Sequence, residues 1–362
     1  MSILKRLLMS SKRSILVARL WEYNLKINHM KKNLIFISLF IVFGNKISSQ
    51  QAVKNYIFFN LERGRIHDSV FLNTKQIEGA QLKYTWKELE PEKDNYRLDL
   101  IENDLDFLIK NKKGLFIQIQ DVSFDTTRIP VPGYLLKDPL YHGGADCQYS
   151  FLNEEETKYI KEGWVARRWD KEVAGRFHKL LTVLGKQFDG KITGINLPET
   201  AVGFGDKEKL HPSGFTFETY RDAIKENMFV AKKSFPNSIV IQYANFMPGE
   251  WLPWTDYSYL KDLYNYAKEI KCGMGGPDIL VYKKGQMNHS YGLIHDCDGV
   301  VPTGVAVQDG NYSHVNPKTN KVVTVPEIYD FGKNYLKLNY IFWCTEEPYF
   351  SKKVIPFLRG LN

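Results

Sequence analysis

The chain has 362 residues, 43% of them hydrophobic, with 49 Lys and Arg, 41 Asp and Glu, and a formal net charge of +8 at pH 7. Nine of the basic residues and one acidic residue lie in residues 1–50, so residues 51–362 contain 40 of each and have no net charge. This balance excludes the strongly basic surface that nucleic-acid-binding domains present, and we expect no nucleic-acid partner.

The first expected element is a targeting segment. A Met-Lys-Lys start at Met30 precedes an apolar run over residues 34–43, interrupted only by Ser38, and a small polar tail. A run of this length is too short to cross a bilayer, which needs about 20 residues. We therefore predict a signal peptide over residues 30–50, with Met30 as the true start, and a secreted or periplasmic protein without stable membrane insertion after cleavage. A membrane anchor with a basic cytoplasmic tail is the alternative.

From residue 51 onward, short apolar runs alternate with segments whose apolar residues recur at helical spacing. The predicted strands are residues 56–61, 77–84, 114–120, 192–197, 238–244, 272–280, 304–308 and 339–344. The predicted helices are residues 100–111, 172–188, 216–235, 257–270 and 325–338, with a closing helix at the end of the chain. Eight strand–helix repeats in roughly 300 residues have the size of an α/β protein of the (β/α)8 TIM barrel class.

These repeats fill residues 51–362 without a linker rich in Ser, Gly or Pro, so we predict one domain. Long loops are expected after the third strand (121–167) and the sixth strand (281–302), on the face where barrel enzymes assemble their active sites. A doubly wound open sheet is the alternative. It would normally have a glycine-rich phosphate-binding turn after the first strand, and this chain has none there.

Cysteine and histidine spacing predicts neither a metal site nor a cofactor. The four cysteines fit no zinc pattern, and the eight histidines show no His-Glu-x-x-His or comparable spacing. An oxidising compartment would allow one or two disulfides, whose pairing the sequence does not define. We therefore expect no metal and no cofactor.

Residues 81–119 resemble a known family. Trp86, Leu89, Glu90 and Pro91 form an aromatic-x-x-Leu-Glu-Pro element ahead of a tyrosine-containing turn and a helix. This segment resembles the region between strands two and three of clan A glycoside hydrolases, a (β/α)8 group that includes β-galactosidase-like enzymes. The resemblance implies a retaining glycosidase, in which one carboxyl group acts as acid/base and a second as nucleophile.

Glu199 follows the fourth predicted strand, and the resemblance implies that it is the general acid/base. In the family an asparagine usually stands directly before this glutamate, whereas here Asn196 stands three residues earlier. Without catalysis, Glu199 would be a loop residue that begins a short helix after Pro198, a position that the helix dipole favours.

The second carboxylate has two candidates. The family has a glutamate at the end of strand seven, where this chain has Gln308 and Asp309. We predict Asp309 or Glu346, which follows strand eight, as the partner of Glu199. The alternatives are an Asp-Gly turn for Asp309 and a solvated loop acid for Glu346. If neither is a nucleophile, the protein is a catalytically inactive barrel that binds glycan.

Aromatic and amide side chains near the strand ends favour a carbohydrate ligand, because sugar faces pack on rings and hydroxyls need polar partners. The predicted contacts are Trp86, Gln118, Gln120, Asn196, Tyr243, Asn245, Trp251, Trp254, Tyr312 and Trp343. The sequence thus predicts a secreted glycoside hydrolase acting on a poly- or oligosaccharide. A polysaccharide lyase, which would need a Tyr or His base near an anionic sugar, is a further alternative.

Overall fold

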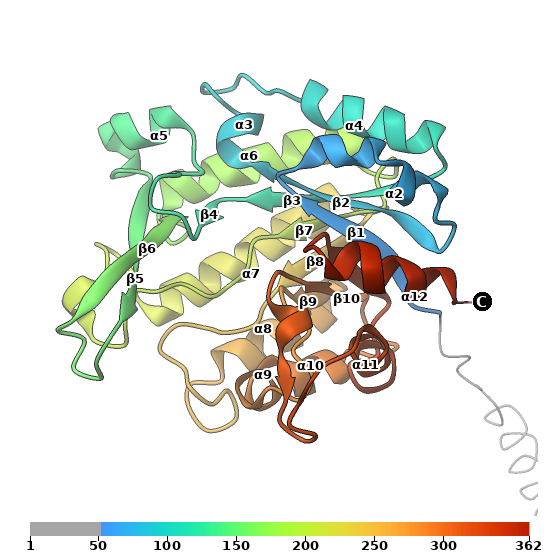
Figure 1. Cartoon of the computed structure of the whole chain (residues 1–362). Coiled ribbons are helices and arrows are strands. Elements are labelled where there is room, and N and C mark those ends of the chain that lie inside the picture. The colour runs from blue at the N-terminus through green and yellow to red at the C-terminus, as the bar shows by residue number, and fades with distance from the viewer. Residues whose placement is uncertain (1–51, 362) are drawn as a thin grey trace, which may run out of the picture. The chain divides into compact units, whose positions relative to one another are not determined.

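The computed structural model describes residues 52–361, which form one compact unit (Figure 1). Eight parallel strands close into a barrel in the order β1-β13-β10-β9-β8-β7-β3-β2. They are β1 (Lys54–Asn60), β2 (Ile77–Thr85), β3 (Gly114–Gln120), β7 (Gly194–Leu197), β8 (Ile239–Tyr243), β9 (Gly273–Gly276), β10 (Thr303–Val307) and β13 (Tyr340–Cys344). Each predicted strand overlaps one of them, so the (β/α)8 barrel is confirmed. The open-sheet alternative is wrong, because β13 pairs with β1 and leaves no edge.

Helices surround the barrel (Figure 1). The longer ones are α4 (Asp99–Lys110), α6 (Lys171–Phe188), α7 (Phe217–Ser234) and α8 (Tyr259–Ile270), each within a few residues of a predicted helix. Their starts have physical causes: the Asp170 carboxylate accepts the first free N–H groups of α6, and Thr216 forms a capping box at α7. The last two predicted helices are each part α and part π: α11 (Val325–Asp330) with η5 (Phe331–Tyr335), and η6 (Phe350–Val354) with α12 (Ile355–Arg359).

Shorter helices and turns connect these elements. They are η1 (Arg63–His67), α2 (Ser69–Asn73), α3 (Trp86–Leu89), α5 (Gly133–Lys137), η2 (Pro139–Tyr141), η3 (Glu208–Leu210), α9 (Lys284–Asn288), α10 (Ser290–His295) and η4 (Asn311–Ser313). A small hairpin pairs β11 (Val315–Asn316) with β12 (Lys321–Val322). None of the helices in residues 52–361 combines the length and the apolar character needed to cross a bilayer. The predicted signal peptide lies outside the described residues.

Aromatic rings fill the interior of the barrel near its amino-terminal end. The ring of Phe116 lies 5.1 Å, centroid to centroid, from those of Tyr56, Tyr340 and Phe342, in edge-on contacts. A Cβ atom at Gly194 would lie 2.3 Å from the Phe116 ring, so glycine is needed there. Because these rings close one end of the barrel, polar side chains farther along the strands gather at the other end, which we call the mouth.

The segment after β3 folds as a three-stranded antiparallel sheet in the order β4-β6-β5, and it projects away from the barrel (Figure 1). Its strands are β4 (Val122–Ser123), β5 (Ala145–Phe151) and β6 (Tyr159–Ala166). Cys147, Cys272, Cys297 and Cys344 are all unpaired. The disulfides that the sequence allowed are therefore not formed.

Candidate active site

Glu199 lies two residues beyond β7, the fourth strand of the barrel, at the mouth. Its side chain is partly buried, and Oε2 accepts a hydrogen bond from Asn245 Nδ2 at 3.1 Å. Burial raises the pKa of Glu199 from 4.5 to about 7; the Asn245 hydrogen bond lowers it, the charge of Asp278 raises it, and Lys83 and Arg168 lower it. About half of the carboxyl groups are therefore protonated at pH 7, where an ordinary glutamate is ionised.

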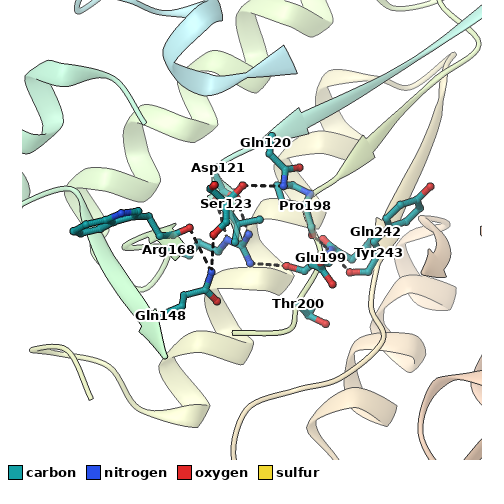
Figure 2. Close-up of polar contacts among 12 residues, drawn as sticks. Gln120, Asp121, Ser123, Gln148, Arg168, Pro198, Glu199, Thr200, Gln242 and Tyr243 are labelled. Carbon is teal, nitrogen blue, oxygen red and sulfur yellow. Dashed lines mark hydrogen bonds and ion pairs between the residues drawn. The ribbon is translucent and has the colours of Figure 1, made fainter. Parts of the chain in front are cut away.

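The backbone of residues 198–200 is fixed by side chains of neighbouring elements, and Figure 2 shows the contacts of Gln242 and Arg168. The three consecutive carbonyl oxygens each accept a hydrogen bond: Pro198 O from Gln242 Nε2 (2.6 Å), Glu199 O from Arg168 Nη1 (2.8 Å) and Thr200 O from Tyr220 Oη (3.0 Å). Thr200 Oγ1 in turn donates to Phe246 O at 2.6 Å. These contacts orient Glu199 through its main chain, and within residues 52–361 its carboxyl group accepts a hydrogen bond from one side chain, that of Asn245.

Arg168 is itself fixed by an ion pair with Asp121, the residue after β3. The two planar groups meet through two hydrogen bonds, Nη2 to Oδ1 at 2.6 Å and Nε to Oδ2 at 2.8 Å. Their side chains are 2% and 1% exposed. A bidentate arginine–carboxylate pair has a strongly preferred geometry. The pair therefore links the end of β3 rigidly to the loop that contains Glu199 (Figure 2).

Two charged residues at the mouth were not among the predicted site residues. Lys83 is on β2, and burial lowers its pKa to about 8, while the charge of Glu199 raises it. Asp278 lies two residues beyond β9, where burial raises its pKa and a hydrogen bond from Asn311 Nδ2 (2.9 Å) lowers it. Like Glu199, Asp278 lies two residues beyond the end of a barrel strand. It was missed because the sixth strand was predicted to extend through residue 280.

Asp309 and Glu346, the predicted partners of Glu199, lie close to each other. One carboxylate oxygen of each and the sulfur of Cys344 all lie within 4.8 Å of one another. Within residues 52–361 this is the one group of acidic, cysteine or histidine donors close enough to share a metal ion. A cavity of about 600 Å³ at the ends of β1, β10 and β13 is lined by this cluster, together with Arg65 and Arg128.

Amide groups inside the barrel have unsatisfied polar atoms. No hydrogen-bond partner within residues 52–361 contacts Oε1 of Gln81, Gln118 or Gln120, or either side-chain polar atom of Asn196. Leaving a buried polar group unpaired costs about 1–3 kcal/mol. Such groups are suited to binding water or sugar hydroxyls. Gln81 was not predicted as a site residue. Its amide nitrogen donates to Tyr243 Oη at 2.8 Å.

Four of the predicted aromatic contacts are buried, namely Trp86, Tyr243, Tyr312 and Trp343, each at most 2% exposed. The indole N–H of Trp343 donates to Asn55 Oδ1, and that of Trp86 donates to Glu90 Oε2, both at 2.9 Å. Neither indole has a face free for a sugar, so the structure differs from the prediction for these two residues. Trp343 packs outside the barrel because its neighbour Phe342 faces inward.

The two remaining aromatic residues are exposed. Trp251 is 74% exposed and Trp254 47% exposed, and the indole N–H of Trp254 donates to Asn288 O at 3.1 Å. Trp251 lines a groove of about 700 Å³ between the β5–β6 hairpin and residues 202–206. Because this groove begins three residues after Glu199 in the chain, it offers additional space next to the Glu199 loop.

No protein-family model and no curated protein matches the chain. Solved structures similar to it include xylanase 10B from Thermotoga petrophila (12% identity, 81% of this chain and 82% of that chain, TM-score 0.48). Others are a xylanase from Paenibacillus barcinonensis (13%, 81% and 84%, TM-score 0.47) and a thermostable mutant of a xylanase from Cellvibrio japonicus (10%, 82% and 87%, TM-score 0.48). With TM-scores below 0.5 these similarities add nothing to the assignment, and the barrel fold rests on the strand pairing.

Proposed function

We propose that the protein is a secreted glycoside hydrolase that cleaves a poly- or oligosaccharide with Glu199 as the general acid. The observation that carries the proposal is a carboxyl group at the end of the fourth barrel strand whose pKa is raised to about 7. A general acid must still be protonated when the leaving-group oxygen departs, and its pKa is best placed near the working pH. A solvated loop glutamate would not meet this requirement.

Three further features support the proposal. The position of Glu199 agrees with the acid/base expected from the resemblance of residues 81–119 to clan A glycoside hydrolases. The contacts to residues 198–200 fix its backbone, as catalytic geometry requires. The unsatisfied amides of Gln118 and Asn196 are partners of the kind that sugar hydroxyls need.

The second carboxylate is to be sought among three residues. Asp309 and Glu346 remain the predicted partners, and Asp278 joins them because its charge acts on Glu199. Each of the three is replaced by its amide, as Asp278→Asn, Asp309→Asn and Glu346→Gln. The variant of the true partner should have a kcat/KM lowered about as much as that of the Glu199 variant, whereas the other two variants should retain activity. The anomeric configuration of the first product, read by NMR, decides between retention and inversion.

The proposal is tested with Glu199→Gln, which keeps the size of the side chain but cannot deliver a proton. We expect kcat/KM on glycans to fall about 10²- to 10⁴-fold, with the circular dichroism spectrum unchanged. For aryl glycosides with acidic leaving groups, kcat/KM should fall less, because these leaving groups need little protonation to depart. Glu208→Gln, at an exposed residue of η3, is the matched control. Full activity of the Glu199 variant would reject the proposal.

A catalytically inactive glycan-binding barrel is the second candidate. It is favoured by Gln308, an amide that stands in the strand-seven region where the family has its nucleophilic glutamate. This candidate predicts that calorimetry detects glycan binding by the wild-type protein while no reducing ends are released. Cleavage of the bound glycan would exclude it.

A further inference from the structure

Lys83 places a cation inside the mouth of the barrel. Two residues earlier on β2, the Gln81 amide reaches Tyr243 Oη of β8 at 2.8 Å, so this face of β2 points inward. Lys83 Nζ lies 5.4 Å from the centroid of the Phe58 ring on β1. The charges of Lys83 and Glu199 also act on each other. Lys83 therefore projects into the space that Glu199 faces.

The ammonium group of Lys83 forms no direct ion pair in the described part of the chain, although the charge of Glu199 acts on it from farther away. No carboxylate oxygen of residues 52–361 lies within 4.0 Å of Nζ, and Nζ donates no hydrogen bond to any of them. Lys113 shows how a structural lysine is satisfied, because its Nζ donates to Thr74 O (3.0 Å) and Ile77 O (2.6 Å). Burying a charge without such partners is costly. A ligand of opposite charge would offset the cost of placing the Lys83 ammonium group here.

The other cations near the mouth differ from Lys83 in being paired. Arg65 pairs with Asp68 at 3.1 Å, and Arg128 pairs with Asp125 at 3.1 Å. Both arginines line the cavity at β1, β10 and β13, where their charges are compensated by these neighbours. Unlike these two arginines, Lys83 has a charge that no carboxylate of residues 52–361 pairs with directly, so its charge is available to a bound molecule.

We propose that Lys83 binds an anionic group of the substrate, and that the glycan cleaved at Glu199 contains a uronic acid. This inference rests on the proposed glycosidase function. The sugar carboxylate would act as the missing counter-ion and accept a charge-assisted hydrogen bond from Nζ. A neutral sugar offers only hydroxyls, which the interior amides can satisfy. A sulfate ester has the same charge, and the experiment includes it as a separate arm.

The test compares the wild-type protein with Lys83→Met, Lys83→Arg and Lys87→Met at pH 7. Lys87 is an exposed residue of α3 and provides the same chemical change outside the mouth. Calorimetry measures binding of free glucuronate, galacturonate and mannuronate and of their neutral hexoses. Activity is compared on polygalacturonate and its methyl ester, on polymannuronate and mannan, and on sulfated and unsulfated galactan.

We expect the wild-type protein to bind or cleave one uronate about 10- to 100-fold better than its neutral counterpart, the usual weight of one charge-assisted hydrogen bond. Lys83→Met should abolish this preference and retain the neutral affinity, while Lys83→Arg and Lys87→Met should keep the preference. Urea unfolding confirms that Lys83→Met is folded.

Three results would overturn the inference. The first is that the wild-type protein binds and cleaves acidic and neutral glycans equally well. The second is that Lys83→Met keeps the preference for the uronate. The third is a Lys83-dependent preference for sulfated galactan over every uronate. In each case the glycosidase proposal survives. If instead no glycan is bound or cleaved, acidic or neutral, the proposed function itself fails.

Discussion

The raised pKa of Glu199 makes the folded state sensitive to pH, and this can be measured without knowing the substrate. The ordinary pKa of a glutamate, which applies to the unfolded chain, is 4.5, and in the barrel the value is about 7. Between these values the folded state retains a proton that the unfolded state has released. Stability therefore falls as pH rises through this window, and the cost disappears below pH 4.5, where both states are protonated.

The size of the effect follows from the shift. A shift of about 2.5 units at 1.36 kcal/mol per unit gives a cost of about 3 kcal/mol when Glu199 is fully ionised. At pH 5 only about 0.8 kcal/mol of that cost is present, because the folded carboxyl group stays protonated. Glu199→Gln has no ionisable group at this position. Relative to the wild-type protein, the variant should therefore gain about 2.5 kcal/mol between pH 5 and pH 7.5.

Urea unfolding at pH 5.0 and pH 7.5 provides the measurement, with the free energy of unfolding determined for the wild-type protein, Glu199→Gln and Glu208→Gln. Subtracting the free energy of unfolding of the wild-type protein from that of a variant removes the contribution of every other carboxylate whose pKa the substitution leaves unchanged. Glu208 is exposed, so its variant should follow the wild-type protein at both pH values. If Glu199→Gln differs from the wild-type protein by the same amount at both, Glu199 has an ordinary pKa and the reasoning is refuted.

Two further predictions concern neighbours of Glu199. Arg168→Met should lower the free energy of unfolding by about 3–5 kcal/mol, because it leaves the Asp121 carboxylate buried and unpaired. Urea unfolding checks this prediction, and the double variant Arg168→Met/Asp121→Leu should recover part of the lost stability. Trp251→Ala should change the free energy of unfolding by less than about 0.5 kcal/mol, since the ring is 74% exposed. Its KM should rise for long oligosaccharides and stay constant for short ones; an unchanged KM for both would exclude the groove as a subsite.

The barrel was predictable because its strands are buried on both faces and read as continuous apolar runs between amphipathic helices. The segment of β3 from Leu115 to Ile117 is an example, with every residue apolar and buried. The β4–β5–β6 sheet gave no such signal. Its strands pair only with one another, and β6 begins with four exposed residues, Tyr159–Glu162, so its sequence resembles a loop.

The candidate site was only partly predictable, because side-chain direction depends on details that a pattern of residue types does not contain. The sixth strand was predicted through residue 280, but it ends at Gly276, ahead of Pro277, which lacks the N–H that a central strand needs. This ending is what places Asp278 at the mouth. Whether the Trp343 side chain faces into or out of the barrel depends on a shift of one residue along the strand, since neighbouring residues of a strand face opposite sides of the sheet.

The arginine beside Glu199 raises the last question, because a cation in contact with an acid normally lowers the pKa of that acid. Arg168 has only a minor lowering effect on Glu199 here, smaller than that of burial. The structure explains why: Asp121 takes two of its hydrogen bonds and neutralises its charge, and its contact with Glu199 is to the main-chain oxygen. The ion pair thus positions the acid without stabilising its ionised form. The pH-dependent difference between wild-type protein and Glu199→Gln measures the net result of burial and of these neighbouring groups on the pKa of Glu199.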